Sequence, residues 1–108
     1  MPVTEISANE LAAGVPVLID VREVDEYVAG HVPGAVNVPL SELQDRVDDC
    51  MLGPVVHVVC AAGGRSLRAC EFLSNVPQAE GRSFVNVAGG TNAWIMAGHE
   101  VVTGESPR

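Results

Sequence analysis

A cysteine followed by small residues and an arginine is the part of this sequence best suited to chemistry. Cys60 ends an apolar run, and the five residues after it are Ala61, Ala62, Gly63, Gly64 and Arg65. Small side chains leave the inside of such a loop empty, and glycine allows the positive φ angles of a tight curl. Backbone N–H groups can then converge and form an anion-binding nest. The segment 60–65 is therefore predicted to hold a nucleophilic cysteine within a ring of N–H donors.

The predicted surroundings of Cys60 favour its thiolate form. A helix expected after the loop directs the partial positive charge of its N-terminus at the cysteine. Arg65 and, one turn later, Arg68 add full charges. We expect a pKa for Cys60 below the ~8.5 of a free cysteine, and the same field would stabilise a persulfide anion or a bound oxyanion. A buried structural cysteine beside a simple glycine turn is the alternative.

Alternating strands and helices must position this loop. A continuous apolar run predicts a buried strand at 55–60, and shorter runs predict strands at 17–21, 35–38 and 83–87. Helices are predicted at 7–14, 23–29, 41–52, 64–75 and 91–97. Two of them begin with capping boxes, Ser7 with Glu10 and Ser41 with Gln44. The alternation predicts an α/β domain with a mostly parallel central sheet and helices on both faces.

The length of 108 residues predicts one domain. We assign residues 1–102 to it, with 101–102 as a further edge strand, and expect 103–108 to form a loose C-terminal tail. Ligands of parallel α/β sheets bind beyond the carboxyl ends of the strands. Cys60 lies at such an end, where a nucleophile would meet its substrate.

Charge excludes several classes of partner. The chain has 14 acidic residues and six basic ones, a formal net charge of −8, and every basic residue is an arginine. Nucleic-acid backbones and anionic membrane surfaces both attract basic proteins, so we expect neither as a partner. No apolar run approaches the ~20 residues that span a bilayer. We therefore expect a cytoplasmic protein.

Cofactors and metals are not indicated. The three cysteines, Cys50, Cys60 and Cys70, show no Cys-x-x-Cys spacing, so neither a disulfide framework nor a zinc site is predicted. Cys50 and Cys70 continue apolar helical faces and are expected in the core, with Cys70 as a resolving thiol the alternative.

Three separated motifs resemble the rhodanese-homology sulfurtransferases. The segment 60–65 is similar to that family's active-site loop, Cys-x-x-Gly-x-Arg. The segment 20–39 resembles its N-terminal signature: Asp-Val-Arg, Glu-aromatic, Gly-His-Val-x-Gly-Ala and Asn-Val-Pro. Near the other end, Gly89-Gly90, Ala93-Trp94 and Ala97-Gly98 resemble its C-terminal signature. The matches span residues 6–102 and imply a single rhodanese-like domain.

The resemblance implies sulfur transfer in two steps. Cys60 would take a sulfane sulfur from thiosulfate or a persulfide donor and hold it as a persulfide. Cyanide, a thiol or a protein thiol would then remove that sulfur; a thioredoxin-like or persulfide-carrying protein is a possible partner. N–H groups from Ala61 to Arg65 would cradle the sulfur, and Arg65 would close the loop and orient an anionic donor.

Other residues are expected to support the loop. Asp20 and Arg22 end a neighbouring strand on the same edge, so Arg22 would either aid donor binding or form a structural ion pair with Asp20. Glu26 is expected to be a solvated helix residue, with support of Arg22 or of the loop as the alternative. His31 is expected to hydrogen-bond the turn at Pro33-Gly34. With Arg65 and Arg68, Arg22 would make a small positive pocket in an acidic surface.

Two other functions stay open. Related phosphatases and arsenate reductases have a loop one residue longer, with arginine six positions after cysteine, where this chain has Ser66. The shorter loop favours one sulfur atom over a tetrahedral phosphate. The second alternative is a non-catalytic rhodanese-like binding or regulatory module, although inactive members often lack the cysteine that this chain keeps.

Overall fold

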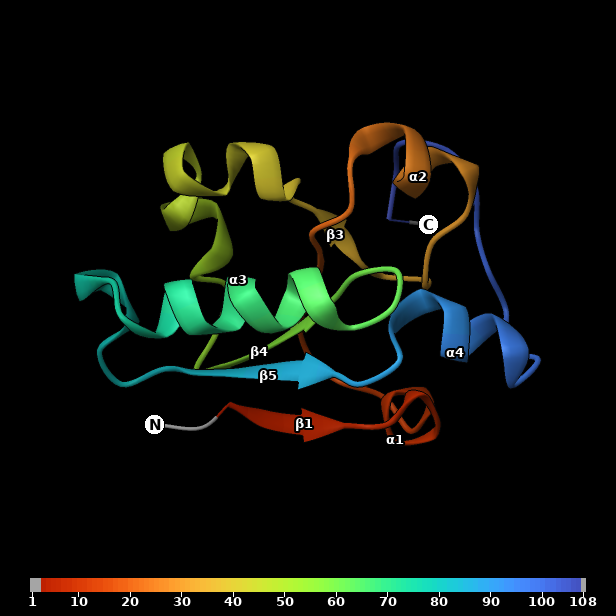
Figure 1. Cartoon of the computed structure of the whole chain (residues 1–108), viewed down its shortest axis with the longest axis horizontal. Helices are drawn as coiled ribbons and strands as arrows, with labels where there is room; N and C mark the ends of the chain where they lie inside the picture. The colour runs from red at the N-terminus through yellow and green to blue at the C-terminus, as the bar shows by residue number, and fades with distance from the viewer. Residues whose placement is uncertain (1–2, 108) are drawn as a thin grey trace.

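Five parallel strands form one sheet in the computed structural model, which describes residues 3–107 (Figure 1). They are β1 (Thr4–Ile6), β2 (Leu18–Asp20), β3 (Val36–Asn37), β4 (Val55–Val59) and β5 (Ser83–Val87). Their order in the sheet is β1-β5-β4-β2-β3. The central strand β4 pairs with β2 and β5, and its last four residues are buried. The sequence prediction of an α/β fold with a parallel sheet is confirmed.

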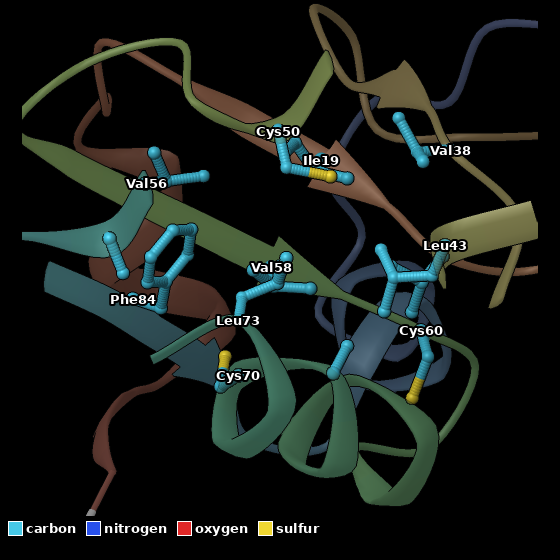
Figure 2. Packing of buried hydrophobic residues seen from close by; sticks show 13 residues of the cluster. Ile19, Val38, Leu43, Cys50, Val56, Val58, Cys60, Cys70, Leu73 and Phe84 are labelled. Carbon is cyan, nitrogen blue, oxygen red and sulfur yellow. The ribbon is translucent and has the colours of Figure 1, made fainter. Parts of the chain in front are cut away.

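Helical segments cover both faces of this sheet. They are α1 (Ala8–Ala12), α2 (Val24–Ala29), α3 (Gly64–Ser74) and α4 (Gly90–Met96), with 3-10 helices η1 (Leu40–Asp45), η2 (Val47–Cys50) and η3 (Pro77–Ala79). One hydrophobic cluster joins the sheet to α3 and the 3-10 helices, and Figure 2 shows Val58, Leu73 and Phe84 within it. A second cluster joins the sheet to α1, α2 and α4 through Leu11, Tyr27 and Trp94.

The capping box in the sequence correctly predicted where the short helix α1 begins. In the predicted capping box before α1, the Glu10 N–H donates to Ser7 Oγ at 3.1 Å and the Ser7 N–H donates to Glu10 Oε1 at 3.0 Å. These two bonds satisfy N–H groups that lack partners within the helix. They let a helix of five residues begin at a defined position.

Two predictions of local structure were wrong or incomplete. The segment 41–52 is not an α-helix but the 3-10 helices η1 and η2. Ser41 does not cap it, because its hydroxyl donates instead to Glu23 Oε1 at 2.6 Å. The apolar face persists, since Leu43 and Cys50 are both buried. Strand β1 was missed: its three residues carry no apolar pattern, and it forms by pairing with β5.

The C-terminal segment lies against α2 and the turn that follows it. The edge strand expected at 101–102 does not form, because Val102 makes only a single antiparallel bridge with His31 outside the main sheet. The Gly104 N–H donates to the Val28 carbonyl at 2.9 Å, and the Gly34 N–H donates to that of Pro107 at 2.8 Å. In the described part of the chain, no helix has the length and hydropathy needed to span a bilayer.

Candidate active site

Cys60 follows β4 directly and lies within a tight loop that leads into α3. Figure 2 shows its side chain beside the start of α3, and only 1% of the residue is exposed. Gly63 caps α3 with a φ of +107°, a left-handed conformation that glycine adopts without strain. This curl lets the Gly63 N–H donate to Cys60 Sγ at 3.1 Å. Ser66, on the first turn of α3, approaches with its hydroxyl 3.2 Å from the same sulfur.

These donors make Cys60 the most acidic of the three cysteine thiols. Burial by itself would raise the pKa of Cys60, but hydrogen bonds from the Ser66 hydroxyl and from the backbone of Ser66, Gly63 and Ala62 outweigh burial and hold the pKa below its ordinary value. Burial raises the pKa of Cys50 to about 11 and that of Cys70 to about 12. The predicted direction for Cys60 is confirmed, and its main cause is hydrogen bonding.

The N-terminus of α4 holds the first half of the loop in place. The Thr91 N–H donates to the Cys60 carbonyl at 2.8 Å, and the Asn92 N–H donates to the Ala61 carbonyl at 3.0 Å. Gly90 permits this close approach: a Cβ there would lie 2.5 Å from the Ala61 carbonyl oxygen and closer still to that of Cys60. The glycine pair 89–90 thus matters to the loop through space, not only as a turn.

A polar chain runs from Cys60 to the edge strand β1. Ser66 Oγ lies 2.5 Å from Asn86 Oδ1. The Asn86 amide nitrogen donates to Glu5 Oε2 at 2.7 Å and to the Gly63 carbonyl at 3.2 Å. Ser66 and Asn86 are both buried. The sequence interpretation used Ser66 only to measure loop length; a polar residue within the apolar strand 83–87 was the signal that could have pointed to Asn86.

Arg65 does not point a free charge at the loop. Its Nη1 and Nη2 donate to Glu26 Oε1 and Oε2 at 2.8 and 2.9 Å, which ties the loop to α2. The Arg65 hydrogen bond is the main reason that the pKa of Glu26 falls to about 2. Simple solvation of Glu26 is therefore wrong, and the alternative, support of the loop, agrees with the structure; α2 and α3 are brought together only by the tertiary fold.

Asp20 and Arg22 form a buried ion pair at the end of β2. Arg22 Nη2 donates to Asp20 Oδ2 at 2.8 Å, and the same nitrogen donates to the Gly30 carbonyl at 2.7 Å. Asn37 adds hydrogen bonds to the backbone carbonyls of both residues. Asp20 is fully buried and Arg22 is 7% exposed. Of the two roles expected for Arg22, this geometry supports the structural one.

The expected positive pocket is largely neutralised. Arg22 and Arg65 are both paired with carboxylates. Arg68 is exposed and has no ion-pair partner among residues 3–107. It borders an open groove of about 440 Å³ beside α3, whose other lining residues are Leu40, Leu43, Gln44 and Phe72. One uncompensated arginine near the loop therefore replaces the three that were expected.

His31, Cys50 and Cys70 belong to the packing of the core. His31 does not bond the Pro33-Gly34 turn: its Nδ1 lies 2.8 Å from the Tyr27 carbonyl, and its ring stacks on that of Tyr27 with centroids 3.7 Å apart. Cys50 and Cys70 are fully buried, and Figure 2 shows Cys70 well along α3 from Cys60. Within residues 3–107 no cluster of His, Cys, Asp or Glu could hold a metal ion.

A parallel sheet, a cysteine at the end of its central strand and a loop of N–H donors define the class of protein. The model of the rhodanese-like domain matches residues 4–97, and the chain belongs to this family.

Individual relatives agree with that assignment. Thiosulfate sulfurtransferase PspE of Escherichia coli is 39% identical over 67% of this chain and 67% of its own length. A sulfurtransferase of Allochromatium vinosum is 32% identical, covering 82% of this chain and 79% of its own. The crystal structure of a rhodanese-related protein from Thermoplasma volcanium has a TM-score of 0.80 at 34% identity, covering 94% of this chain and 99% of the other. This chain spans only 40%, 40% and 59% of three further curated relatives.

Proposed function

We propose that this chain is a sulfurtransferase that carries a sulfane sulfur on Cys60, from thiosulfate or a persulfide donor to a thiophilic acceptor. One observation carries the proposal: the Cys60 sulfur receives hydrogen bonds from Gly63 N–H and the Ser66 hydroxyl, and its pKa is lowered. A thiolate formed without a general base can attack directly. Relatives named as sulfurtransferases support the same chemistry.

The first half-reaction loads the enzyme. The Cys60 thiolate attacks the outer sulfur of thiosulfate and forms a new S–S bond. The S–S bond of thiosulfate breaks, and its electron pair leaves with sulfite. The product is a Cys60 persulfide whose negative charge lies on the outer sulfur. N–H groups of residues 61–65 would bind that sulfur, as the Gly63 N–H binds the thiolate.

The second half-reaction returns the thiolate. A nucleophilic acceptor attacks the outer sulfur and bonds to it, and the electron pair of the persulfide bond returns to Cys60 Sγ. With cyanide the product is thiocyanate, and with a thiol it is a new persulfide. The same donors that lower the pKa of Cys60 make it a good leaving group. No proton transfer to or from Cys60 is needed in either step.

The shape of the site supports a small donor. Because only 1% of Cys60 is exposed, a donor must present a terminal sulfur atom without bulky neighbouring groups to reach it. Arg68, exposed one turn along α3, can attract an anion such as thiosulfate, or a carboxylate of a protein acceptor. The Asp20–Arg22 pair would support the loop from β2. Free Cys50, Cys60 and Cys70 suit a reducing compartment such as the cytoplasm.

The test is to mix the protein with thiosulfate and measure its intact mass. We expect the mass of one added sulfur atom, lost again on addition of cyanide with release of thiocyanate. A Cys60→Ala variant should gain no sulfur, whereas Cys70→Ala, the matched loss of a buried thiol from α3, should gain it. An adduct retained in Cys60→Ala contradicts the assignment.

The same preparation separates the alternatives. Hydrolysis of p-nitrophenyl phosphate without thiocyanate formation would favour the phosphatase-like function. Neither activity, with no sulfur adduct from any persulfide donor, would favour a binding module.

A further inference from the structure

We propose that Asn86 is a positioning residue that controls which atom receives the proton of the Ser66 hydroxyl, and thereby how strongly Ser66 stabilises the Cys60 sulfur. This inference rests on the proposed function for its catalytic meaning. The arrangement of the four side chains from Glu5 to Cys60 carries it.

The orientation of the Asn86 amide is decided by its neighbours. Its nitrogen faces two acceptors, Glu5 Oε2 at 2.7 Å and the Gly63 carbonyl at 3.2 Å. Turning the amide over would set its oxygen against both, leaving two oxygen–oxygen contacts in place of two hydrogen bonds. Asn86 is only 1% exposed, so water could not compensate. Asn86 Oδ1 is therefore held toward Ser66 as an acceptor.

Ser66 has one proton and several acceptors within reach. Its Oγ lies 2.5 Å from Asn86 Oδ1, 3.2 Å from Cys60 Sγ and 3.3 Å from the Gly63 carbonyl. Ser66 is fully buried, so no water molecule donates a hydrogen bond to the acceptor that the Ser66 hydroxyl leaves free. The Ser66 hydroxyl can therefore donate to Cys60 Sγ only when it no longer donates to Asn86 Oδ1, and it can donate to Asn86 Oδ1 only when it no longer donates to Cys60 Sγ.

The charge on the Cys60 sulfur decides this competition during turnover. A thiolate is a charged acceptor and draws the hydroxyl to Sγ. In the persulfide the charge lies on the outer sulfur, Sγ is neutral, and the hydroxyl returns to Asn86 Oδ1. Ser66 then stabilises Sγ when it is a nucleophile or a leaving group, and releases it while the sulfur is carried. The hydroxyl only rotates; no bond to its proton breaks.

Other charges near Cys60 do not offer the same control. The Arg65 guanidinium is held by Glu26. The Cys70 thiol is neutral, because burial raises its pKa to about 12. Glu5 is exposed on β1 and connects to the sulfur through Asn86 and Ser66.

The test is a double-mutant cycle on the Cys60 thiolate. The acid dissociation constant of Cys60, which sets its thiolate fraction, is measured from the pH dependence of Cys60 alkylation by iodoacetamide, followed by peptide mass spectrometry. Ser66→Ala should lower that constant about tenfold, since it removes a hydrogen bond to a charged group. Asn86→Ala should raise it about threefold, because Asn86 Oδ1 no longer competes with Sγ for the Ser66 proton. In the Ser66→Ala background, Asn86→Ala should change nothing. A lowered constant in Asn86→Ala, or an effect that persists without Ser66, would overturn the proposal.

Variants of the exposed residue Glu5 repeat the test in case Asn86→Ala does not fold. Glu5→Ala removes the nearer of the two acceptors that orient the amide and should raise the thiolate fraction in the same direction, by less than Asn86→Ala and again only when Ser66 is present. Glu5→Gln removes the charge but keeps an acceptor oxygen, so its thiolate fraction should stay near that of the unmodified protein. Equal effects of the two variants would mean that the charge of Glu5 acts directly, and would overturn the proposal.

Failure of the proposed function can be distinguished from failure of the proposed role of Asn86. Alkylation reports on Cys60 whether or not sulfur is transferred, whereas the sulfur adduct tests transfer alone. Absence of the adduct with the cycle as expected would reject the function and keep the role of Asn86.

Discussion

Arg65 and Glu26 form an ion pair with two hydrogen bonds, 2.8 and 2.9 Å long, between the loop that follows Cys60 and helix α2. The carboxylate also accepts the Glu23 N–H at 3.1 Å at the start of α2. Glu26 therefore links the N-terminal cap of α2 to Arg65, at the end of the loop that leads into α3. In this arrangement the arginine of the loop fixes loop geometry, and its charge is already compensated.

Glu26→Gln should destabilise the protein in a pH-dependent way. The pKa of Glu26 is lowered to about 2 from an ordinary 4.5, so its contribution is complete above about pH 4.5 and is lost as the pH falls toward 2. Because the Glu26 side chain is 35% exposed, solvent screening limits the loss at neutral pH to about 1 kcal/mol. Urea unfolding of both proteins at several pH values measures this difference.

The matched control for that experiment is Asp25→Asn. It removes the same charge from the same helix turn, at an exposed position without a described ion pair. We expect little change in the free energy of unfolding. A loss equal to that of Glu26→Gln would mean that helix charge, not the bond to Arg65, is responsible.

Gly90→Ala should distort the loop that begins at Cys60. Gly90 has a φ of +60°, and an added Cβ would press on the carbonyl groups of Cys60 and Ala61. We expect sulfur transfer to fall at least about tenfold, as expected for a displaced nucleophile. Gly98→Ala is the control, since its φ of +83° carries similar strain but nothing lies within 4 Å of the added Cβ. Equal loss of thiocyanate formation in both variants would contradict the contact with the loop.

Arg22→Met should destabilise the fold strongly. It leaves the fully buried Asp20 carboxylate without its ion-pair partner, a loss of about 3 kcal/mol or more. The same substitution at Arg46, which forms exposed pairs with Glu42 and Asp49, should cost less than about 1 kcal/mol. Urea unfolding compares the two. A raised KM for thiosulfate at unchanged stability would instead assign Arg22 to donor binding.

Alkylation should select Cys60 among the three cysteines. Its pKa is lowered, whereas burial raises the pKa of Cys50 to about 11 and of Cys70 to about 12. In the folded protein at about pH 7, we expect iodoacetamide to label Cys60 at least about tenfold faster than the other two. Denaturation in urea should remove the difference. Comparable labelling of Cys70 in the folded state would show that α3 opens to expose it.

Elements with strong local signals were predictable. The continuous apolar run of β4 and the capping box of Ser7 and Glu10 each act within a few residues, so the positions of β4 and α1 followed from the sequence. The 3-10 segment from Leu40 to Cys50 did not, because the long-range bond from Ser41 to Glu23 replaced the predicted cap. Strand β1 depends on its pairing with β5 and has no local signal.

The amino-acid sequence alone predicts that Cys60 follows a buried strand and begins a loop small enough to surround one sulfur atom. Composition and spacing are enough for this prediction, because small glycine and alanine residues determine locally how tightly their own backbone can curl. The groups that surround the loop follow from the three-dimensional fold: Glu26 binds Arg65, α4 binds the Cys60 carbonyl, and Asn86 binds Ser66. These contacts join residues 20 to 39 positions apart, and they exist because β2, β4 and β5 end at the same edge of one parallel sheet.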